Sequence, residues 1–160
     1  MQTPMTKTLY DRDFQQWIEK TINQLQKHEF EDLDIDYLIE ELKDLGKSEK
    51  RTLESNLMIL LAHLLKLQVQ QDVPEMMKVS WYNSANEHRK RVQKNLKDTP
   101  SLKSYLDTAI QEAYPDARDL AITESKNANF GVHIPNKSEY PMICPFSVEE
   151  ILDNSFYGVL

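Results

Sequence analysis

Apolar residues recur every three or four positions through most of the chain, which is the spacing of one face of an α-helix. The first such stripe predicts a helix over residues 10–27 and consists of Tyr10, Phe14, Trp17, Ile18, Ile22 and Leu25. Similar stripes predict helices over residues 35–45, 49–71, 81–96 and 100–125. The helix over residues 49–71 is apolar on nearly all sides, which is typical of a helix buried among others, so we expect it at the centre of the fold.

Residues that start and end helices divide these stripes. Gly46 is placed to end the second helix in a left-handed conformation, and Ser48 is placed to cap the third. Pro115 falls inside the fifth stripe and should kink or break that helix. The sequence SVEE at residues 147–150 matches a capping box, which predicts a short last helix over residues 148–153.

The fold class that these helices predict is an all-α, single-domain bundle over residues 1–160. It has about five main helices, the third of them central, and a short C-terminal helix. Its core is expected over about residues 9–126. Residues 127–146 contain three prolines and a glycine without helical spacing, so we expect an irregular segment there, followed by a docked tail over residues 147–160. The chain has only three glycines, which favours helices over strands because the turns between strands favour glycine.

Four polar residues interrupt the most apolar stretch, residues 56–70, namely Asn56, His63, Lys66 and Gln70. Steps of seven, three and four residues return to the same face of an α-helix, so these side chains form one line along the third helix. The line is the exposed edge of the helix, a buried polar seam bound by neighbouring side chains, or a functional site.

A buried Lys66 would need a carboxylate, because an unpaired ammonium group is costly in a core. The second helix is the expected source, since a short connection at Gly46 would make it a neighbour of the third. We expect His63 and Lys66 to be mostly buried, with residues of the fourth helix nearby. The candidate polar cluster therefore consists of Glu40, Glu41, His63, Lys66, Trp81 and Arg89.

Composition and charge place the chain among ordinary globular proteins of the cytoplasm. The formal net charge is −7, and the single cysteine, Cys144, fits a reducing compartment because it cannot form an internal disulfide. The first residues lack the apolar core of a signal peptide. The apolar run from Leu57 to Leu67 is shorter than the ~20 residues that cross a bilayer, so no membrane-spanning segment is expected.

Motifs that carry chemistry are few. The four histidines form no pair at the spacing of helical metal sites, and we predict neither a metal nor another cofactor. Basic residues gather at residues 87–97, where a solvated helix face with Glu87 paired to Arg91 is expected. Contact with nucleic acid through residues 88–97 is an alternative, although an acidic chain with one basic segment is not typical of such proteins.

Several segments, in this order, carry a family resemblance: LYDRDFQQW, LDIDYLIEELKDLGKSEKRTLESNLMILLAHLLKLQ, SW followed by HRKRV, SLKSYLDTAIQEAYPDARDLA, and CPFSVEEILD. From Leu9 to about Asp153 the sequence resembles the bacterial, largely cyanobacterial, domain-of-unknown-function family 29. The resemblance implies a small helical bundle and no established activity. Leu67, where relatives often carry an aromatic residue, and Pro115 depart from the family pattern. The positions that match it include Glu40, Glu41, Gly46, Glu49, His63, Lys66, Trp81 and Arg89.

Two classes of function follow from these observations. The first, which we favour, is an interaction or regulatory module that binds a protein partner; it suits the size, the acidic charge and the lack of a catalytic motif. The second is an enzyme or ligand-binding protein with a polar site around His63, Lys66 and a glutamate of the second helix. The sequence indicates no substrate, no partner identity and no oligomeric state.

Overall fold

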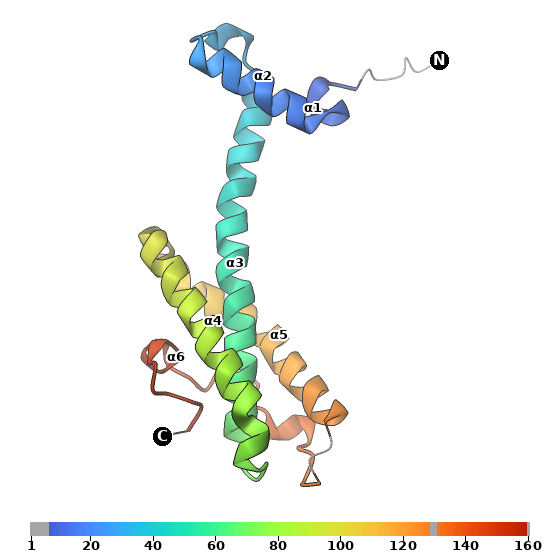
Figure 1. The fold of residues 1–160 in the computed structure, drawn as a ribbon, viewed down its shortest axis with the longest axis vertical. Coiled ribbons are helices and arrows are strands. Elements are labelled where there is room, and N and C mark those ends of the chain that lie inside the picture. Colours follow the sequence, from blue (N-terminus) through green and yellow to red (C-terminus); the bar gives the residue numbers. More distant parts are fainter. Residues whose placement is uncertain (1–6, 129–130, 160) are drawn as a thin grey trace, which may run out of the picture. The chain divides into compact units, whose positions relative to one another are not determined.

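All the regular elements in the described part of the chain are helices (Figure 1). The structure is a computed structural model that describes residues 7–128 and 131–159. Its α-helices are α1 (Leu9–Arg12), α2 (Phe14–Gln26), α3 (Ile35–Val69), α4 (Val79–Asp98), α5 (Leu106–Asn127) and α6 (Val148–Leu152). Short 3-10 helices lie between them: η1 (Phe30–Asp32), η2 (Glu75–Lys78), η3 (Pro100–Tyr105) and η4 (Lys137–Glu139). The prediction of an all-α fold is confirmed.

The helices pack into two compact units, which divide between Ser48 and Glu49. We call the part before this boundary unit 1 and the part after it unit 2. The boundary falls inside α3, so the two units share this helix. The expectation of one domain over residues 1–160 stays a prediction.

A single helix, α3, stands where the sequence analysis expected two. Gly46 lies inside α3 and does not end a helix. It does not adopt the left-handed conformation expected of a C-cap, since among the described glycines only Gly131 and Gly158 have positive φ. A glycine inside a helix costs only about 1 kcal/mol relative to alanine. Residues 47–54 include several strong helix formers (lysine, glutamate, arginine and leucine), and they carry the helix onward. No helix in the described ranges, α3 included, is long and apolar enough to cross a membrane.

The predicted helix over residues 10–27 is also divided differently, into α1 and α2. Asp13 separates them and caps α2, because its side chain accepts a hydrogen bond of 3.0 Å from the amide of Gln16. Thr8 and Asp11 form a capping box at the start of α1. Two caps within six residues let the chain fold α1 against α2 in unit 1.

Unit 1 is held by a small aromatic cluster. The ring of Tyr10 stacks on Tyr37 of α3, with centroids 4.1 Å apart, and meets the edge of Trp17 at 5.0 Å. The Tyr10 hydroxyl donates a hydrogen bond to Glu41, which raises the pKa of Tyr10 to about 12. Among the described residues of unit 1, only Trp17 and Thr21 are buried. Unit 1 therefore has very little core of its own.

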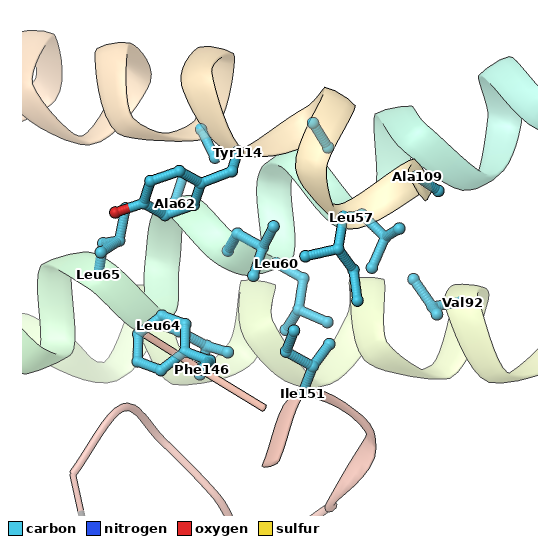
Figure 2. Close-up of a cluster of buried hydrophobic side chains, with 14 of the residues drawn as sticks. Leu57, Leu60, Ala62, Leu64, Leu65, Val92, Ala109, Tyr114, Phe146 and Ile151 are labelled. Atoms are coloured by element: carbon cyan, nitrogen blue, oxygen red, sulfur yellow. The ribbon is translucent and has the colours of Figure 1, made fainter. Parts of the chain in front are cut away.

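Unit 2 contains the main hydrophobic core, and the second half of α3 lies at its centre (Figure 2). Side chains from α3, α4, α5 and the C-terminal part of the chain meet there, among them Leu57, Leu60, Leu64, Val92, Ala109, Tyr114, Phe146 and Ile151. The leucines of α3 in this group have no exposed surface. The prediction that the apolar helix is central is confirmed.

Pro115 does not break the fifth helix. The α-helix α5 continues through it from Leu106 to Asn127, and the predicted first turns, residues 100–105, form η3 instead. Proline removes the hydrogen bond to the carbonyl of Gln111, four residues earlier. Both residues lie on the exposed face of α5, where water can bind the freed carbonyl, so the buried face of the helix stays intact.

The C-terminal segment, residues 131–159, is mostly irregular, and several of its side chains, among them Phe146, Ile151 and Phe156, pack in the core of unit 2. Its helix α6 begins with the predicted capping box: the amide of Glu150 donates to Ser147 Oγ, and the amide of Ser147 donates to the Glu150 carboxylate. Arg118 of α5 donates to the carbonyls of Tyr140 and Lys137. Residue 160, the end of the expected tail, lies outside the described residues.

The central position of α3 predicts the effect of removing one of its leucines. Leu60→Ala or Leu64→Ala should lower the free energy of unfolding by about 2–5 kcal/mol, because each leaves a cavity in a packed core. Urea denaturation followed by circular dichroism measures this change. Met142→Ala is the control, because Met142 is 77% exposed and its removal should leave the denaturation midpoint in place. Unchanged midpoints for both leucine variants would contradict the position of α3 in the core.

A second prediction concerns the tail, which approaches the backbone of α3 closely at Gly158. This residue has φ +87°, and a Cβ atom there would lie 2.4 Å from the carbonyl oxygen of Leu64. Gly158→Ala should therefore destabilise unit 2 by about 1–3 kcal/mol, since the backbone conformation is strained for alanine and the tail must move. Gly46→Ala is the matched control, because a Cβ atom at Gly46 meets nothing within 4 Å. Equal urea midpoints for the two variants would contradict the docked tail.

Candidate functional site

Lys66 is buried and paired, as the sequence analysis expected, but its partner comes from a different helix. The Nζ atom of Lys66 lies 2.5 Å from Glu124 Oε2 of α5 and 4.6 Å from the ring centroid of Trp81 of α4. The side chain of Lys66 is 7% exposed and that of Glu124 is 38% exposed. Three helices thus meet at one ammonium group, and Glu124 is a member of the cluster that the sequence analysis missed.

Neither expected glutamate is the partner of Lys66. Glu40 forms an exposed ion pair with Lys43 at 3.5 Å, and Glu41 accepts the hydrogen bond from Tyr10. The expectation was wrong because it placed a break at Gly46. Without that break the glutamates and Lys66 belong to one helix, and side chains on one α-helix meet only at spacings of three or four residues.

His63 is half-buried rather than mostly buried, and it is bound to its own helix. Its Nδ1 atom lies 2.8 Å from the carbonyl oxygen of Ile59 and therefore acts as the donor. Burial lowers the pKa of His63, so the ring is neutral at neutral pH. His88 is bound in the same way, with Nδ1 2.9 Å from the carbonyl oxygen of Ser84. Within the described ranges no three histidine, cysteine, aspartate or glutamate side chains come together in a way that could hold a metal.

Arg89 is the most deeply buried charge of the candidate cluster, and its contacts lie with the C-terminal segment. It is 1% exposed, and it donates hydrogen bonds of 2.8 Å to the carbonyl of Ile151 and 2.6 Å to that of Phe156. Its guanidinium also lies 5.6 Å from the ring centroid of Tyr157. Burial lowers the pKa of Arg89. Arg89 therefore fixes the tail on α4.

The other basic side chains of α4 include two that are neutralised within the helix. Arg91 pairs with Glu87, as predicted, and Lys94 pairs with Asp98, each at 2.5 Å. With Arg89 buried, the exposed positive charge of residues 88–97 is smaller than the sequence suggests. The geometry gives little support to the alternative of nucleic-acid contact.

The remaining polar residues of the line on α3 also bind neighbouring side chains. Asn56 donates to Asn95 of α4 at 3.2 Å, and Gln70 donates to the hydroxyl of Tyr140 at 3.2 Å. Each member of the line thus has a polar partner. Lys66, Gln70 and Asn56 bind other elements and so help to fix α3 against its neighbours, whereas His63 binds its own helix. The seam is buried at Lys66 and Gln70 and half-buried at the other two residues. The ammonium group of Lys66, held by a carboxylate, is poorly suited to act as a nucleophile.

A different feature, an apolar groove, lies on unit 1 between α2 and the first part of α3. It has a volume of about 350 Å³ and is lined by Phe14, Trp17, Ile18, Thr21, Ile22, Leu25, Leu38, Glu41, Leu42 and Leu45. Leu42 is 60% exposed and Leu45 is 65% exposed. Together with the adjacent Ile35 and Ile39, these residues are called the α2–α3 surface below.

The side chains of this surface form apolar stripes in the sequence, and these stripes predict a core. That prediction depends on a helix break at Gly46, which would let the second helix pack against the third. In the structure α3 continues through Gly46, and the part of its first stripe that α2 leaves uncovered, including Leu42 and Leu45, is exposed. The signal that could have found the surface is the run of strong helix formers after Gly46.

The Lys66–Glu124 pair predicts an asymmetric response to mutation. Glu124→Gln should cost more stability than Lys66→Met, because it leaves the buried ammonium unpaired, whereas Glu124 is 38% exposed and regains water when Lys66 is lost. A double-mutant cycle measured by urea denaturation should give a coupling of at least ~1 kcal/mol. The exposed pair of Lys94 and Asp98 is the control and should give a much smaller coupling. Additive effects in the first cycle would show that the pair does not stabilise the core.

Comparison with known proteins is consistent with the resemblance seen in the sequence. The model of the family described as "Domain of unknown function DUF29" matches residues 9–157, from the first residue of α1 to the tail after α6. No curated protein and no solved structure matches the chain. Because the family match covers nearly all of the 160 residues, the chain belongs to the DUF29 family.

Proposed function

We propose that the chain is a protein-interaction module whose α2–α3 surface binds an amphipathic α-helical face of a protein. Unit 2 is the fixed body of the module, and unit 1 carries the binding surface. The observation that supports this proposal is the apolar groove on unit 1, in which Leu42 and Leu45 are more than half exposed. Exposed apolar surfaces of this kind mark sites of protein association.

The shape and lining of the groove favour a helix as the bound element. Two helices form its walls, and nearly all of its lining side chains are apolar. An amphipathic helix binds such a groove through apolar side chains spaced three and four residues apart, while its polar face stays in water. The net charge of residues 1–48 is −5, from 11 acidic and 6 basic side chains, so lysine or arginine at the edges of the bound helix would be favourable.

The alternative of an enzyme centred on His63 and Lys66 has less support. Lys66 is bound by Glu124 and Trp81, Arg89 is bound by carbonyls of the C-terminal segment, and His63 is bound to its own helix. The contacts of these side chains stabilise the fold of unit 2. Breaking the contacts so that the side chains could take part in catalysis would destabilise unit 2. The proposal involves no cofactor, and it places the module in the cytoplasm, where the single cysteine, Cys144, would stay reduced.

Binding of a helical probe tests this proposal. The probe is a fluorescein-labelled 18-residue peptide with leucine at helical spacings of three and four and with lysine and glutamine elsewhere. We expect saturable binding in fluorescence anisotropy, and at least tenfold weaker binding to Leu42→Glu, because that change puts a carboxylate in the groove.

Two controls make the result specific. Met142→Glu changes a side chain of unit 2 that is 77% exposed, and it should leave the affinity unchanged. A peptide of the same composition in scrambled order should not bind. Equal binding of both peptides, or an unchanged affinity for Leu42→Glu, would refute the proposal.

A further inference from the structure

Unit 1 is ordered around very few buried side chains. Two of its described residues, Trp17 and Thr21, are buried, while eight large apolar side chains are exposed: Phe14, Ile22, Leu25, Phe30, Ile35, Ile39, Leu42 and Leu45. Burial of apolar surface is the main driving force for folding, and short helices in water are marginal without it. Covering these exposed side chains with a surface outside unit 1 would therefore stabilise it.

The apolar side chains of unit 1 are exposed whenever this unit is folded, which favours a partner that is always present to cover them. A second copy of the chain meets this condition, because it is made at the same time and in the same amount. Interfaces of obligate homodimers are apolar and resemble a domain core cut in two, which describes the α2–α3 surface. Two helices from each copy would form a four-helix bundle, in which each helix turns its apolar stripe inward.

The charges along α3 select the direction of this second copy. Residues 34–41 hold four acidic side chains and no lysine or arginine, whereas residues 42–48 hold Lys43 and Lys47 beside Asp44. An antiparallel copy brings the acidic part of one α3 opposite the lysines of the other. A parallel copy would bring acidic side chains together, which is unfavourable.

One of these lysines already has a partner within its own chain. Lys43 lies 3.5 Å from Glu40, and both side chains are about 60% exposed. Exposed ion pairs of this kind contribute little stability, so this pair competes weakly with contacts to a second copy. Lys47 is exposed as well.

We infer that the α2–α3 surface binds the same surface of a second copy of this chain, in an antiparallel arrangement with two-fold symmetry. Such an interface is isologous: each copy offers the same patch, and every contact occurs twice. This inference rests on the proposed function and names the partner that the groove binds. Order in unit 1 then depends on association.

The mass of the full chain in solution tests the inference. Sedimentation equilibrium at micromolar concentration should give twice the chain mass of 18.8 kDa. Leu42→Glu should weaken the association at least tenfold, because the two-fold arrangement buries two carboxylates in one apolar interface. Met142→Glu is the matched control in unit 2 and should remain a dimer.

A second measurement guards against misfolding of the Leu42 variant. Hydrogen exchange of the wild-type chain should slow down in residues 9–48 as the protein concentration rises through the dissociation constant, because association stabilises the folded form by mass action. Exchange in residues 49–128 should not depend on concentration. Concentration-independent exchange in both parts would overturn the inference.

Charge reversal tests the antiparallel direction without changing the apolar contacts. One variant carries Lys43→Glu and Lys47→Glu, and the other carries Asp36→Lys and Glu40→Lys. Each variant alone should dimerise at least tenfold more weakly than the wild type, and an equimolar mixture should form a heterodimer. A mixture that associates no better than its components would contradict the proposed pairing.

The outcomes separate this inference from the proposed function. A chain that is monomeric at all concentrations, or a dimer that Leu42→Glu leaves intact, overturns the second copy as the partner. If that monomer still binds the amphipathic peptide at Leu42, the interaction module stands and its partner is another protein. If the second copy is the partner, an excess of the peptide should dissociate the dimer.

Discussion

The irregular C-terminal segment can cover unit 2 only if its backbone carbonyls find donors, because a buried carbonyl without a partner costs free energy that a folded chain cannot spare. Arginines supply these donors. Arg89 of α4 reaches the carbonyls of Ile151 and Phe156, and Arg118 of α5 reaches those of Tyr140 and Lys137. A guanidinium offers several donors in a rigid plane, so a single arginine can bind two carbonyls at once. The core of unit 2, which includes Phe146 and Ile151, depends on these contacts.

The same requirement explains why the charges of unit 2 are poor candidates for catalysis. In the described residues its buried charged side chains are already bound: Arg89 and Arg118 by carbonyls, Lys66 by Glu124, and Lys78 by Glu75 and the carbonyl of Gln71. Within the Arg89 guanidinium, Nη1 alone is buried without a hydrogen-bond partner. Releasing an arginine to a ligand would leave buried carbonyls without donors. Releasing Lys66 or Lys78 would break its pair with Glu124 or Glu75. Unit 1 has the opposite character, since its unsatisfied surface is apolar and exposed. Unit 1, whose apolar surface is not covered by its own side chains, is therefore the unit for which binding is proposed.

Periodicity in the sequence was sufficient for the helices and for the centre of the fold, but it did not determine what covers each stripe. The leucines of residues 53–65 were correctly placed in the core because apolar side chains surround that helix on nearly all sides. The break at Gly46 was wrong because a cap signal competes with the helix propensity of its neighbours, and here the propensity prevails. The same error led to the wrong prediction for the partner of Lys66. Glu124 lies 58 residues away in sequence, and no local pattern connects a lysine to a carboxylate so distant.

The helix α3 is amphipathic in unit 1 and largely buried in unit 2, so its two parts are stabilised in different ways. In unit 2 the side chains of α3 are enclosed by the chain itself, so this half of the helix is ordered whether or not anything is bound. In unit 1 the side chains of Leu42 and Leu45 on the same helix are exposed to water. Any surface that buries these two leucines would stabilise the folded form of unit 1. If the α2–α3 surface binds a partner as proposed, binding would contribute to folding as well as to affinity, and part of the binding free energy would be used to order unit 1. Such coupling lowers affinity for a given buried area and makes the complex sensitive to small changes in the apolar stripe.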